Sequence, residues 1–410
     1  MTDTNLIVFT YAPAGLGHIR VADALISGIP KGSRYTIFAP EDKSTESMHR
    51  FSSLNVPARH VMEFFQRGFA EALYTKFYIA FLKKHSNKLE DQFVEHILLQ
   101  KIKPTTLTIV ATHFGLAYQL GSVKTHLEKR LNAKIKLVVQ VTDDSPQILW
   151  YVDLADLIIC PSHQTKLALQ KYAQSRHLKQ VPIEVVPYPV DLDFSKALAP
   201  NQISQRESQL NPNDNSAINI AIPISGAAVG MEFFLHLIQW LHNFSPRFVF
   251  YVICRKAPFT EVFLKQIANR EYIKVFTSDD YNEVVKMHKQ VYLEHTISAE
   301  VTKPSEQAFK ALINATAIGG SFLLFAHPVG RQEYDNMDFL RRHNFLDDTK
   351  NHRRGYPLVL GSKASSDLIW DLFSSGKFLK AFKNFSSPPQ TDEVGDNGVT
   401  KFWEIVNSLN

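Results

Sequence analysis

The stretch that decides the fold reads LIVFTYAPAGLGH, from Leu6 to His18. Its apolar beginning predicts a strand, its glycines a turn, and residues 19–29 a helix, because apolar side chains recur there on one face. Glycines let a ligand approach the backbone closely, and a helix N-terminus offers N–H groups to an anion. We therefore expect Gly15 and Gly17 to form an acceptor or phosphate loop, with His18 placed as a base. A plain packing turn is the alternative.

The length and composition of the chain favour two globular domains. It has 410 residues, 45% of them hydrophobic, and a formal charge of +5, whereas single domains commonly contain about 100–200 residues. The mild positive charge suits an anionic ligand or membrane surface, and no nucleic-acid-binding module is present. The strand at the start leaves no room for a signal peptide, and no apolar run could span a bilayer. We expect a cytoplasmic location, with peripheral binding to the inner face of the plasma membrane as an option.

Cysteine and histidine patterns argue against cross-links and metals. Cys160 and Cys254 each end a strand-like run, which favours reduced core thiols over a disulfide. The 16 histidines show no metal-binding spacing. We expect no cofactor and no metal in the site.

Short apolar runs alternate with helical patterns, which predicts parallel sheets covered by helices. The expected strands of the first half are Leu6–Thr10, Tyr35–Phe38, Leu107–Ala111, Leu137–Val141, Leu157–Cys160 and Ile183–Val186. Those of the second half are Ile218–Ile222, Phe248–Cys254, Ile273–Thr277, Val291–Leu293 and Phe322–Ala326. The expected fold class is α/β, with two Rossmann-like domains that face a central cleft.

Composition also sets the expected domain boundaries. A stretch with two prolines, residues 186–194, and a polar stretch, residues 201–216, separate the halves. We expect an N-terminal domain over residues 1–195, a linker over 196–216 and a C-terminal domain over 217–396. Residues 397–410 are expected to form a last helix that packs back on the N-terminal domain.

The second half contains two turns that suit a phosphate and a ribose. Ser225, Gly226 and Ala227 open a turn of small residues whose N–H groups could reach a diphosphate, although the lysine of a P-loop is missing. Glu306 lies at the start of a predicted helix, 307–314, where its carboxylate could accept hydrogen bonds from a ribose. The alternatives are a helix-packing turn and a simple helix cap.

Two further groups of polar residues follow buried strands. Gln332, Glu333 and Asn336 follow the strand at 322–326 and could bind the hydroxyls of a sugar, unless they form an ordinary polar loop. Asp143 and its neighbour Asp144 follow the strand at 137–141. One of these acids could act as a base or orient His18, or both could merely cap the next segment.

A helical segment, residues 61–99, interleaves aromatic and basic side chains. Such a pattern suits a membrane interface, and a core-facing helix with a solvated rim is the alternative. The candidate membrane contacts are Phe65, Phe69, Lys76, Phe77, Lys83 and Lys84.

Taken together, these motifs resemble family 28 of the GT-B glycosyltransferases. That family includes monogalactosyldiacylglycerol synthases, diacylglycerol glucosyltransferases and the bacterial peptidoglycan GlcNAc transferase. The matching segments run in the family's order from residue 10 to about residue 340. They are Gly15–His18, Val141–Asp143, Cys160–Ser162, Pro187–Phe194, Ser225–Gly230, Thr302–Glu306 and Gly330–Asn336. In the fourth of them, Tyr188 stands where the family has glycine.

The resemblance implies a UDP-sugar donor bound by the C-terminal domain and a lipid or glycan acceptor bound by the N-terminal one. The family inverts the anomeric carbon without a metal. By this resemblance His18 would be the base or a substrate positioner, with Asp143 as the alternative base. The donor would be bound by Ser225, Gly226, Ala227, Lys303, Ser305, Glu306, Gln332, Glu333 and Asn336.

Two other functions fit the same fold. One is a sugar-nucleotide epimerase, such as the non-hydrolysing UDP-GlcNAc 2-epimerases, although the sequence does not reveal the additional carboxylates that this chemistry would use. The other is a non-catalytic protein that binds nucleotide sugars or glycans.

Overall fold

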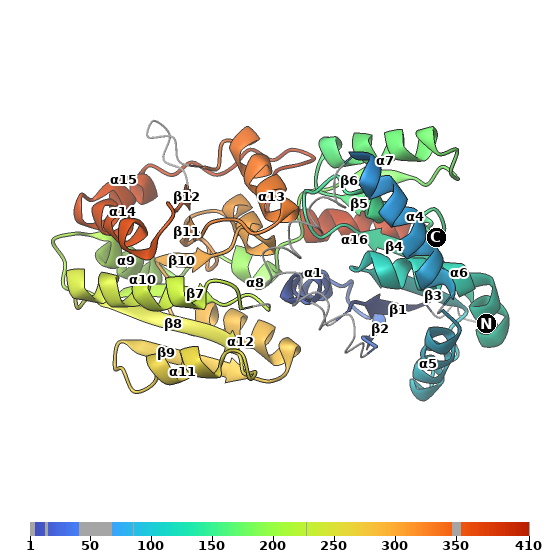
Figure 1. Ribbon diagram of the computed structural model, residues 1–410, viewed down its shortest axis with the longest axis horizontal. Helices are drawn as coiled ribbons and strands as arrows, with labels where there is room; N and C mark the ends of the chain where they lie inside the picture. Colours follow the sequence, from blue (N-terminus) through green and yellow to red (C-terminus); the bar gives the residue numbers. More distant parts are fainter. Residues whose placement is uncertain are drawn as a thin grey trace. The chain divides into compact units, whose positions relative to one another are not determined.

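The computed structural model describes residues 5–12, 15–40, 68–84, 86–226, 228–346 and 354–409 (Figure 1). Within residues 68–76 it describes the backbone and the side chain of Thr75. The chain divides into two compact units. The first comprises residues 1–189, 391–393 and 397–410, and the second comprises residues 190–390 and 394–396.

The first unit is built on a six-stranded parallel sheet in the order β2-β1-β3-β4-β5-β6. Its strands are β1 (Asn5–Thr10), β2 (Arg34–Phe38), β3 (Thr106–Ala111), β4 (Lys134–Gln140), β5 (Leu157–Cys160) and β6 (Ile183–Val185). Its helices are α1 (Leu16–Ser27), α4 (Gly68–Lys84), α5 (Ser86–Leu99), α6 (Phe114–Leu131), the short 3-10 helix η1 (Ile148–Trp150), α7 (His163–Ser175) and α16 (Gly398–Ser408). All six strands predicted for this half are present.

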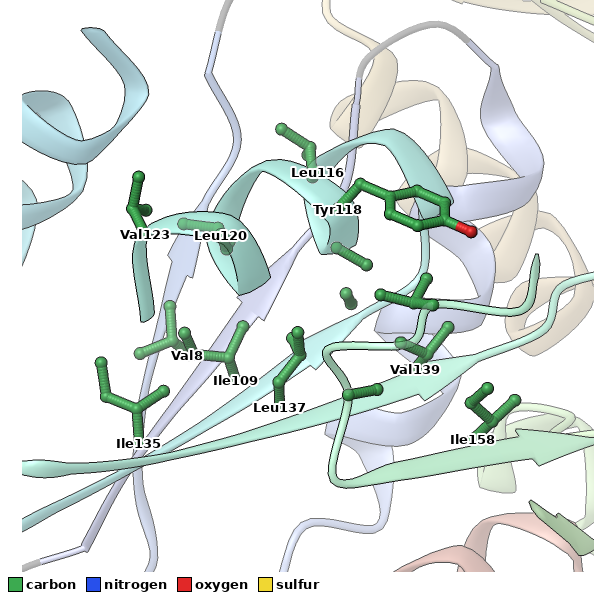
Figure 2. Packing of buried hydrophobic residues seen from close by; sticks show 14 of the residues in the cluster. Val8, Ile109, Leu116, Tyr118, Leu120, Val123, Ile135, Leu137, Val139 and Ile158 are labelled. Carbon is green, nitrogen blue, oxygen red and sulfur yellow. The ribbon is translucent and has the colours of Figure 1, made fainter. Parts of the chain in front are cut away.

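Helix α6 covers the middle of this sheet. Leu116, Leu120 and Val123 on α6 belong to the same buried hydrophobic cluster as Val8 and Leu137 on the strands, and Figure 2 shows α6 lying over these strands. Each of these side chains is at most 7% exposed, and burying an aliphatic side chain of this size contributes about 1.5–3 kcal/mol. This packing therefore holds the strand ends in place, and with them the loops at the carboxyl edge of the sheet.

The last helix, α16, packs on the first unit. The indole Nε1 of Trp403 donates to Leu25 O over 2.8 Å, and its ring meets Phe9 edge-on with centroids 6.0 Å apart. At the end of the helix, Lys136 Nζ donates to Leu409 O over 2.9 Å. The chain thus returns to α1, β1 and β4 after completing the second unit.

The second unit repeats the architecture, with a parallel sheet in the order β12-β11-β10-β7-β8-β9. Its strands are β7 (Ile218–Pro223), β8 (Phe248–Arg255), β9 (Ile273–Ser278), β10 (Ala299–Thr302), β11 (Phe322–Phe325) and β12 (Gly355–Pro357). Its helices are α8 (Leu192–Ser195), α9 (Pro200–Leu210), α10 (Met231–Phe244), α11 (Glu261–Ile267), α12 (Tyr281–Glu294), the 3-10 helix η2 (Glu306–Leu312), α13 (Arg331–Arg342), α14 (Ser362–Ser374) and α15 (Lys377–Lys383).

One of the strands predicted for this unit is wrong. The expected strand at residues 291–293 belongs to α12, whose buried residues recur at helical spacing. The helix predicted at residues 307–314 is present as the 3-10 helix η2, which ends two residues earlier. The polar stretch expected to be a linker contains α9, which packs through the buried Arg206 and Leu210.

Strand β10 escaped prediction because a charged residue lies in its middle. Glu300 is 0% exposed, and its Oε2 accepts hydrogen bonds from Tyr292 (2.7 Å) and Lys310 (2.5 Å) and lies 2.9 Å from His288 Nε2. Burial alone would raise the pKa of Glu300, but the adjacent Lys310 and His288 hold it well below the usual range. These contacts join β10 to η2 through Lys310, and to α12 through His288 and Tyr292.

The two cysteines are both free and buried, as the sequence predicted. Burial raises the pKa of Cys160 and that of Cys254 to about 12. Both thiols are therefore uncharged core groups near neutral pH.

Candidate functional site

His18 is the third residue of α1, at the carboxyl edge of the first sheet. Its Nδ1 lies 2.6 Å from Thr112 O, just beyond the end of β3. Because a carbonyl oxygen can only accept, Nδ1 carries the proton and Nε2 is the basic nitrogen. Thr112 Oγ1 donates to His18 O over 2.9 Å, and Thr112 N–H donates to Thr10 O over 3.0 Å. These bonds fix the imidazole against the ends of β1 and β3.

The glycine loop before α1 leaves space for a ligand at one position. Gly15 precedes the first residue of α1, and a Cβ atom placed on it would meet no heavy atom of the described residues within 4 Å. Gly17 lies in the first turn of the helix and is half-buried. Pro13 and Ala14 lie outside the described residues. The role of both glycines in binding an acceptor or phosphate stays a prediction.

The two acids after β4 have different environments. Asp144 is 1% exposed, and its Oδ1 accepts hydrogen bonds from Ser162 Oγ and from Thr165 Oγ1, the latter over 3.0 Å. Ser162 Oγ also accepts from Thr165 N at the start of α7. Asp144 therefore stabilises the beginning of α7, which is the structural role that the sequence left open.

Asp143, by contrast, is half-buried and faces His18 through one intervening hydroxyl. Thr142 Oγ1 donates to Asp143 Oδ2 over 3.4 Å and lies 3.4 Å from His18 Nδ1. The structure thus brings Asp143 and His18 into one hydrogen-bond network, in which the Thr142 hydroxyl lies within 3.4 Å of both.

Aromatic rings surround the His18 imidazole. The ring of His113 meets it edge-on, with centroids 4.9 Å apart, and Trp150 lies 6.4 Å away. His113 in turn stacks on Phe114 at 4.9 Å. Such a wall lowers the local polarity, which strengthens hydrogen bonds made by the imidazole. Sequence reasoning missed these rings because His113 and Phe114 lie far from His18 in the chain.

The glycine turn of the second unit leads into α10, as predicted. Ser225 and Gly226 are half-buried at the carboxyl end of β7, while Ala227 lies outside the described residues. Gly230 precedes α10 with a φ of +85°, a left-handed conformation that favours glycine. The turn therefore presents the N-terminus of a 14-residue helix at the carboxyl edge of the sheet.

The loop after β10 carries Lys303, Ser305 and Glu306 to the same edge. Lys303 is 8% exposed, and its Nζ donates to the carbonyl oxygen of His327, the residue that follows β11 by two positions. Ser305 and Glu306 are half-buried at the start of η2. Lys303 therefore joins the loops after β10 and β11, and Glu306 occupies the helix start that the sequence predicted.

The loop after β11 places Gln332, Glu333 and Asn336 on α13, where they differ in exposure. Gln332 is half-buried. Asn336 is 0% exposed, and its Nδ2 donates to Pro304 O over 3.1 Å, so it binds one loop of the edge to the other. Direct contact of Asn336 with a sugar stays a prediction. In this structure the buried amide instead holds the loop after β10 in place through its hydrogen bond to Pro304 O.

Glu333 has an unusual carboxyl group. Its Oε2 accepts from Val329 N over 2.5 Å, which caps the start of α13. Burial raises the pKa of Glu333 to about 7, although the Lys303 ammonium and the Val329 amide oppose this shift, and the Glu306 carboxylate adds to it. A titratable carboxyl near neutral pH at the end of a sheet is typical of functional sites.

A second pair of side chains at this edge was not predicted. Arg255, at the end of β8, stacks its guanidinium 3.9 Å from the ring centroid of Tyr281, at the start of α12, and donates to the phenol oxygen over 2.5 Å. Arg255 Nε also donates to Asp279 O over 3.1 Å. The sequence offered one signal for this pair. Arg255 comes directly after the predicted strand 248–254, and Tyr281 comes shortly after the predicted strand 273–277.

Helix α4 has two large aromatic residues that do not pack in the core. Phe77 is 68% and Phe81 is 59% exposed, whereas Leu82 on the opposite face is 8% exposed and belongs to the core of the first unit. The helix therefore has the core-facing side of the alternative interpretation, formed by Leu82 with Tyr78 and Ile79, and Phe77 lies on its solvated side. Lys84 is exposed, and Lys83 Nζ lies 3.8 Å from Asp153 Oδ1. Phe65 lies outside the described residues, as do the side chains of Phe69 and Lys76.

Neither a metal centre nor a membrane span is found in the described parts of the chain. No group of three or more His, Cys, Asp or Glu side chains among those residues could hold a metal ion. No helix in the same ranges is both long and apolar enough to cross a bilayer.

Comparisons with solved structures define the class of fold. No protein-family model matches the sequence, and no characterised protein resembles it significantly in sequence. The structure of MnaA from S. aureus with UDP is 11% identical, with a TM-score of 0.52 over 99% of this chain and 97% of that one. A candidate UDP-N-acetylglucosamine 2-epimerase from Listeria monocytogenes is 9% identical, with a TM-score of 0.52 over 100% and 97%. UGT89C1 from Arabidopsis thaliana with UDP is 11% identical, with a TM-score of 0.50 over 99% of both chains.

The two parallel sheets and these similarities identify the fold as GT-B. The likeness extends over nearly the whole of each compared chain, so it covers both units. The three structures do not single out family 28 within that fold.

Proposed function

We propose that this protein is a glycosyltransferase that moves a sugar from a UDP-sugar to the hydroxyl of a lipid or lipid-linked acceptor. The observation that supports this best is the 2.6 Å contact between His18 Nδ1 and Thr112 O. In the neutral imidazole this contact places the proton on Nδ1 and leaves Nε2 as the nitrogen that can accept a proton, as a general base does.

The reaction would proceed in one displacement. The acceptor hydroxyl gives its proton to His18 Nε2 while its oxygen forms a bond to the anomeric carbon. The bond from that carbon to the diphosphate oxygen breaks, UDP leaves, and the configuration is inverted. The imidazolium then returns its proton to solvent. None of these steps uses a metal.

The second unit would bind the donor. Negative charge that develops on the leaving diphosphate would be stabilised by the N–H groups at the start of α10, next to Ser225 and Gly226. The Glu306 carboxylate would accept hydrogen bonds from the ribose. Lys303 supplies positive charge at the same edge, and Gln332 offers an amide to the sugar.

The proposal is tested by incubating the protein with a panel of UDP-sugars and measuring UDP release with and without vesicles that contain glycerolipids. We expect one donor to be consumed faster in the presence of acceptor. The His18→Gln variant should lower turnover by about 100-fold or more while UDP binding persists. His126→Gln, which changes an exposed histidine on α6, is the matched control. Near-normal turnover of the His18 variant would transfer the base role to Asp143.

Membrane binding through α4 is part of this proposal. Its support is the exposure of Phe77 and Phe81 beside the exposed Lys84. Cations near an anionic surface contribute about 1 kcal/mol each, and aromatic rings insert at the interface. Replacing Phe77 and Phe81 with serine should reduce cosedimentation with anionic vesicles. The matched control, Leu360→Ser, alters a side chain of the second unit that is 74% exposed. Equal cosedimentation of both variants would argue against α4 as the contact.

A sugar-nucleotide epimerase is the second candidate, because one of the structures with a TM-score of 0.52 is a candidate UDP-N-acetylglucosamine 2-epimerase. Inverting a carbon that carries hydrogen requires its proton to leave and return. Incubation with UDP-GlcNAc in heavy water should then introduce deuterium into the sugar without any acceptor. Binding of UDP-sugars without transfer or exchange would favour a non-catalytic protein.

A further inference from the structure

We infer that Thr142 is a positioning residue that couples the Asp143 carboxylate to the His18 imidazole. The inference rests on the proposed function only for the reaction that His18 would catalyse. The link between Asp143, Thr142 and His18 is independent of that function. It assigns to the hydroxyl of Thr142 a role that the sequence motif did not reveal.

The direction of each hydrogen bond in this network follows from its acceptor. Asp143 Oδ2 is a carboxylate oxygen, so the Thr142 hydroxyl donates its only proton to it over 3.4 Å. The lone pairs of Thr142 Oγ1 then face His18 Nδ1, also at 3.4 Å. The Nδ1 proton therefore has two acceptors, Thr112 O at 2.6 Å and Thr142 Oγ1. Charge on the imidazolium would thus be stabilised by a carboxylate through one hydroxyl.

Both bonds of the Thr142 hydroxyl are long. Hydrogen bonds in an active site are often long before substrate binds and tighten in the reacting complex. The 2.6 Å bond to Thr112 O already fixes the tautomer, so the contribution of Thr142 is expected when positive charge develops on the ring.

The backbone of Thr142 is held in place by a buried tyrosine. Tyr188 OH donates to Thr142 O over 2.8 Å, and the two residues are each 2% exposed. Tyr188 occupies the position at which the sequence departs from the glycine of the family 28 motif. This departure therefore has a structural consequence, because the phenol supports the residue that links Asp143 to His18.

Several ionisable groups lie on the elements next to His18, and the test must separate their effects. His113 comes from the start of α6 with its ring centroid 4.9 Å away. Asp143 follows β4, Tyr188 follows β6, and Arg20 lies two residues further along α1. Asp144 is turned toward Ser162 and Thr165. A change that arises through Thr142 should therefore persist when His113 is replaced by Phe.

The first experiment is an NMR titration of the full-length protein labelled with ¹⁵N-histidine, with His18 assigned from the His18→Gln spectrum. We expect neutral His18 to carry its proton on Nδ1. In Thr142→Val the midpoint of its titration should move to lower pH, because the imidazolium loses its link to a negative charge. Thr142→Ser should restore the wild-type midpoint. The matched control is Thr36→Val, which removes a hydroxyl 2.9 Å from Nε2 of a different histidine, His96, and should leave His18 unchanged.

The second experiment measures turnover of the same variants with the donor identified above. Thr142→Val should lower kcat by about 10- to 100-fold with KM for the donor unchanged, and Thr142→Ser should recover most of the loss. A neutral His18 protonated on Nε2, or a Thr142→Val titration identical to wild type, would overturn the inference. If wild-type protein consumes no UDP-sugar but the titration behaves as expected, the proposed function fails and the coupling stands.

Discussion

The carboxyl group of Glu333 should make the second unit less stable as the pH rises. Its pKa of about 7 in the folded chain compares with an ordinary value of 4.5. Between these values the unfolded chain has released the proton while the folded chain retains it, so the free energy of unfolding falls with increasing pH. The difference corresponds to about 3 kcal/mol, all of it lost above pH 7.

Replacing Glu333 with glutamine tests this reasoning. Glutamine keeps an oxygen that can accept the hydrogen bond from Val329 N and imitates the protonated acid. Glu333→Gln should therefore match wild type at pH 4.5 and be more stable by up to about 3 kcal/mol at pH 8. Urea unfolding can be followed through Trp240 and Trp370, which lie in the second unit, in a background that carries phenylalanine at the two remaining tryptophans.

The control for this experiment is Glu261→Gln. Glu261 is exposed on α11 and pairs with Lys265 at 2.7 Å, which lowers its pKa. Its replacement should not reproduce the rise in stability at pH 8. The reasoning would be refuted if Glu333→Gln were no more stable than wild type at pH 8, or if the difference were the same at pH 4.5 and pH 8.

Two other predictions concern the same unit. Lys310→Met should lower the free energy of unfolding by about 3–5 kcal/mol, because it leaves the buried Glu300 carboxylate without its cation; the double variant that adds Glu300→Gln should recover part of this loss, and full additivity in urea unfolding would contradict the pairing. Glu306→Ala should weaken UDP binding by about 1–3 kcal/mol, the scale of a lost charged hydrogen bond, and unchanged affinity by calorimetry in a folded variant would remove Glu306 from the donor site.

The sequence was most informative where a local pattern and the fold agree. Runs such as Leu157–Cys160 are buried on both faces of a parallel sheet, so their apolar composition alone identifies them as strands. The glycine turns before α1 and α10 were equally clear. Strand β10 could not be identified in this way, because the carboxylate of Glu300 can be buried only when Lys310, from another element, lies beside it.

The candidate site shows the same division. His18, Asp143, Glu306 and Glu333 were chosen as candidates because each follows a strand or starts a helix, and the carboxyl ends of parallel strands meet at one edge. Their individual roles depended on which partners the tertiary structure supplies. The two neighbouring acids, Asp143 and Asp144, differ in burial and in partners, because a hydroxyl near His18 lies beside Asp143 and the start of α7 lies beside Asp144.

By itself, therefore, the sequence determined that the chain forms two α/β units and which loops lie at their sheet edges. This information is local, since it depends on the period of apolar residues and on glycine at turns. Only the tertiary structure decided that the His18 proton lies on Nδ1, that Phe77 and Phe81 are exposed, and which acid is structural. Those properties arise from contacts between residues far apart in the chain, such as His18 and Thr112, and no pattern within a short segment specifies them.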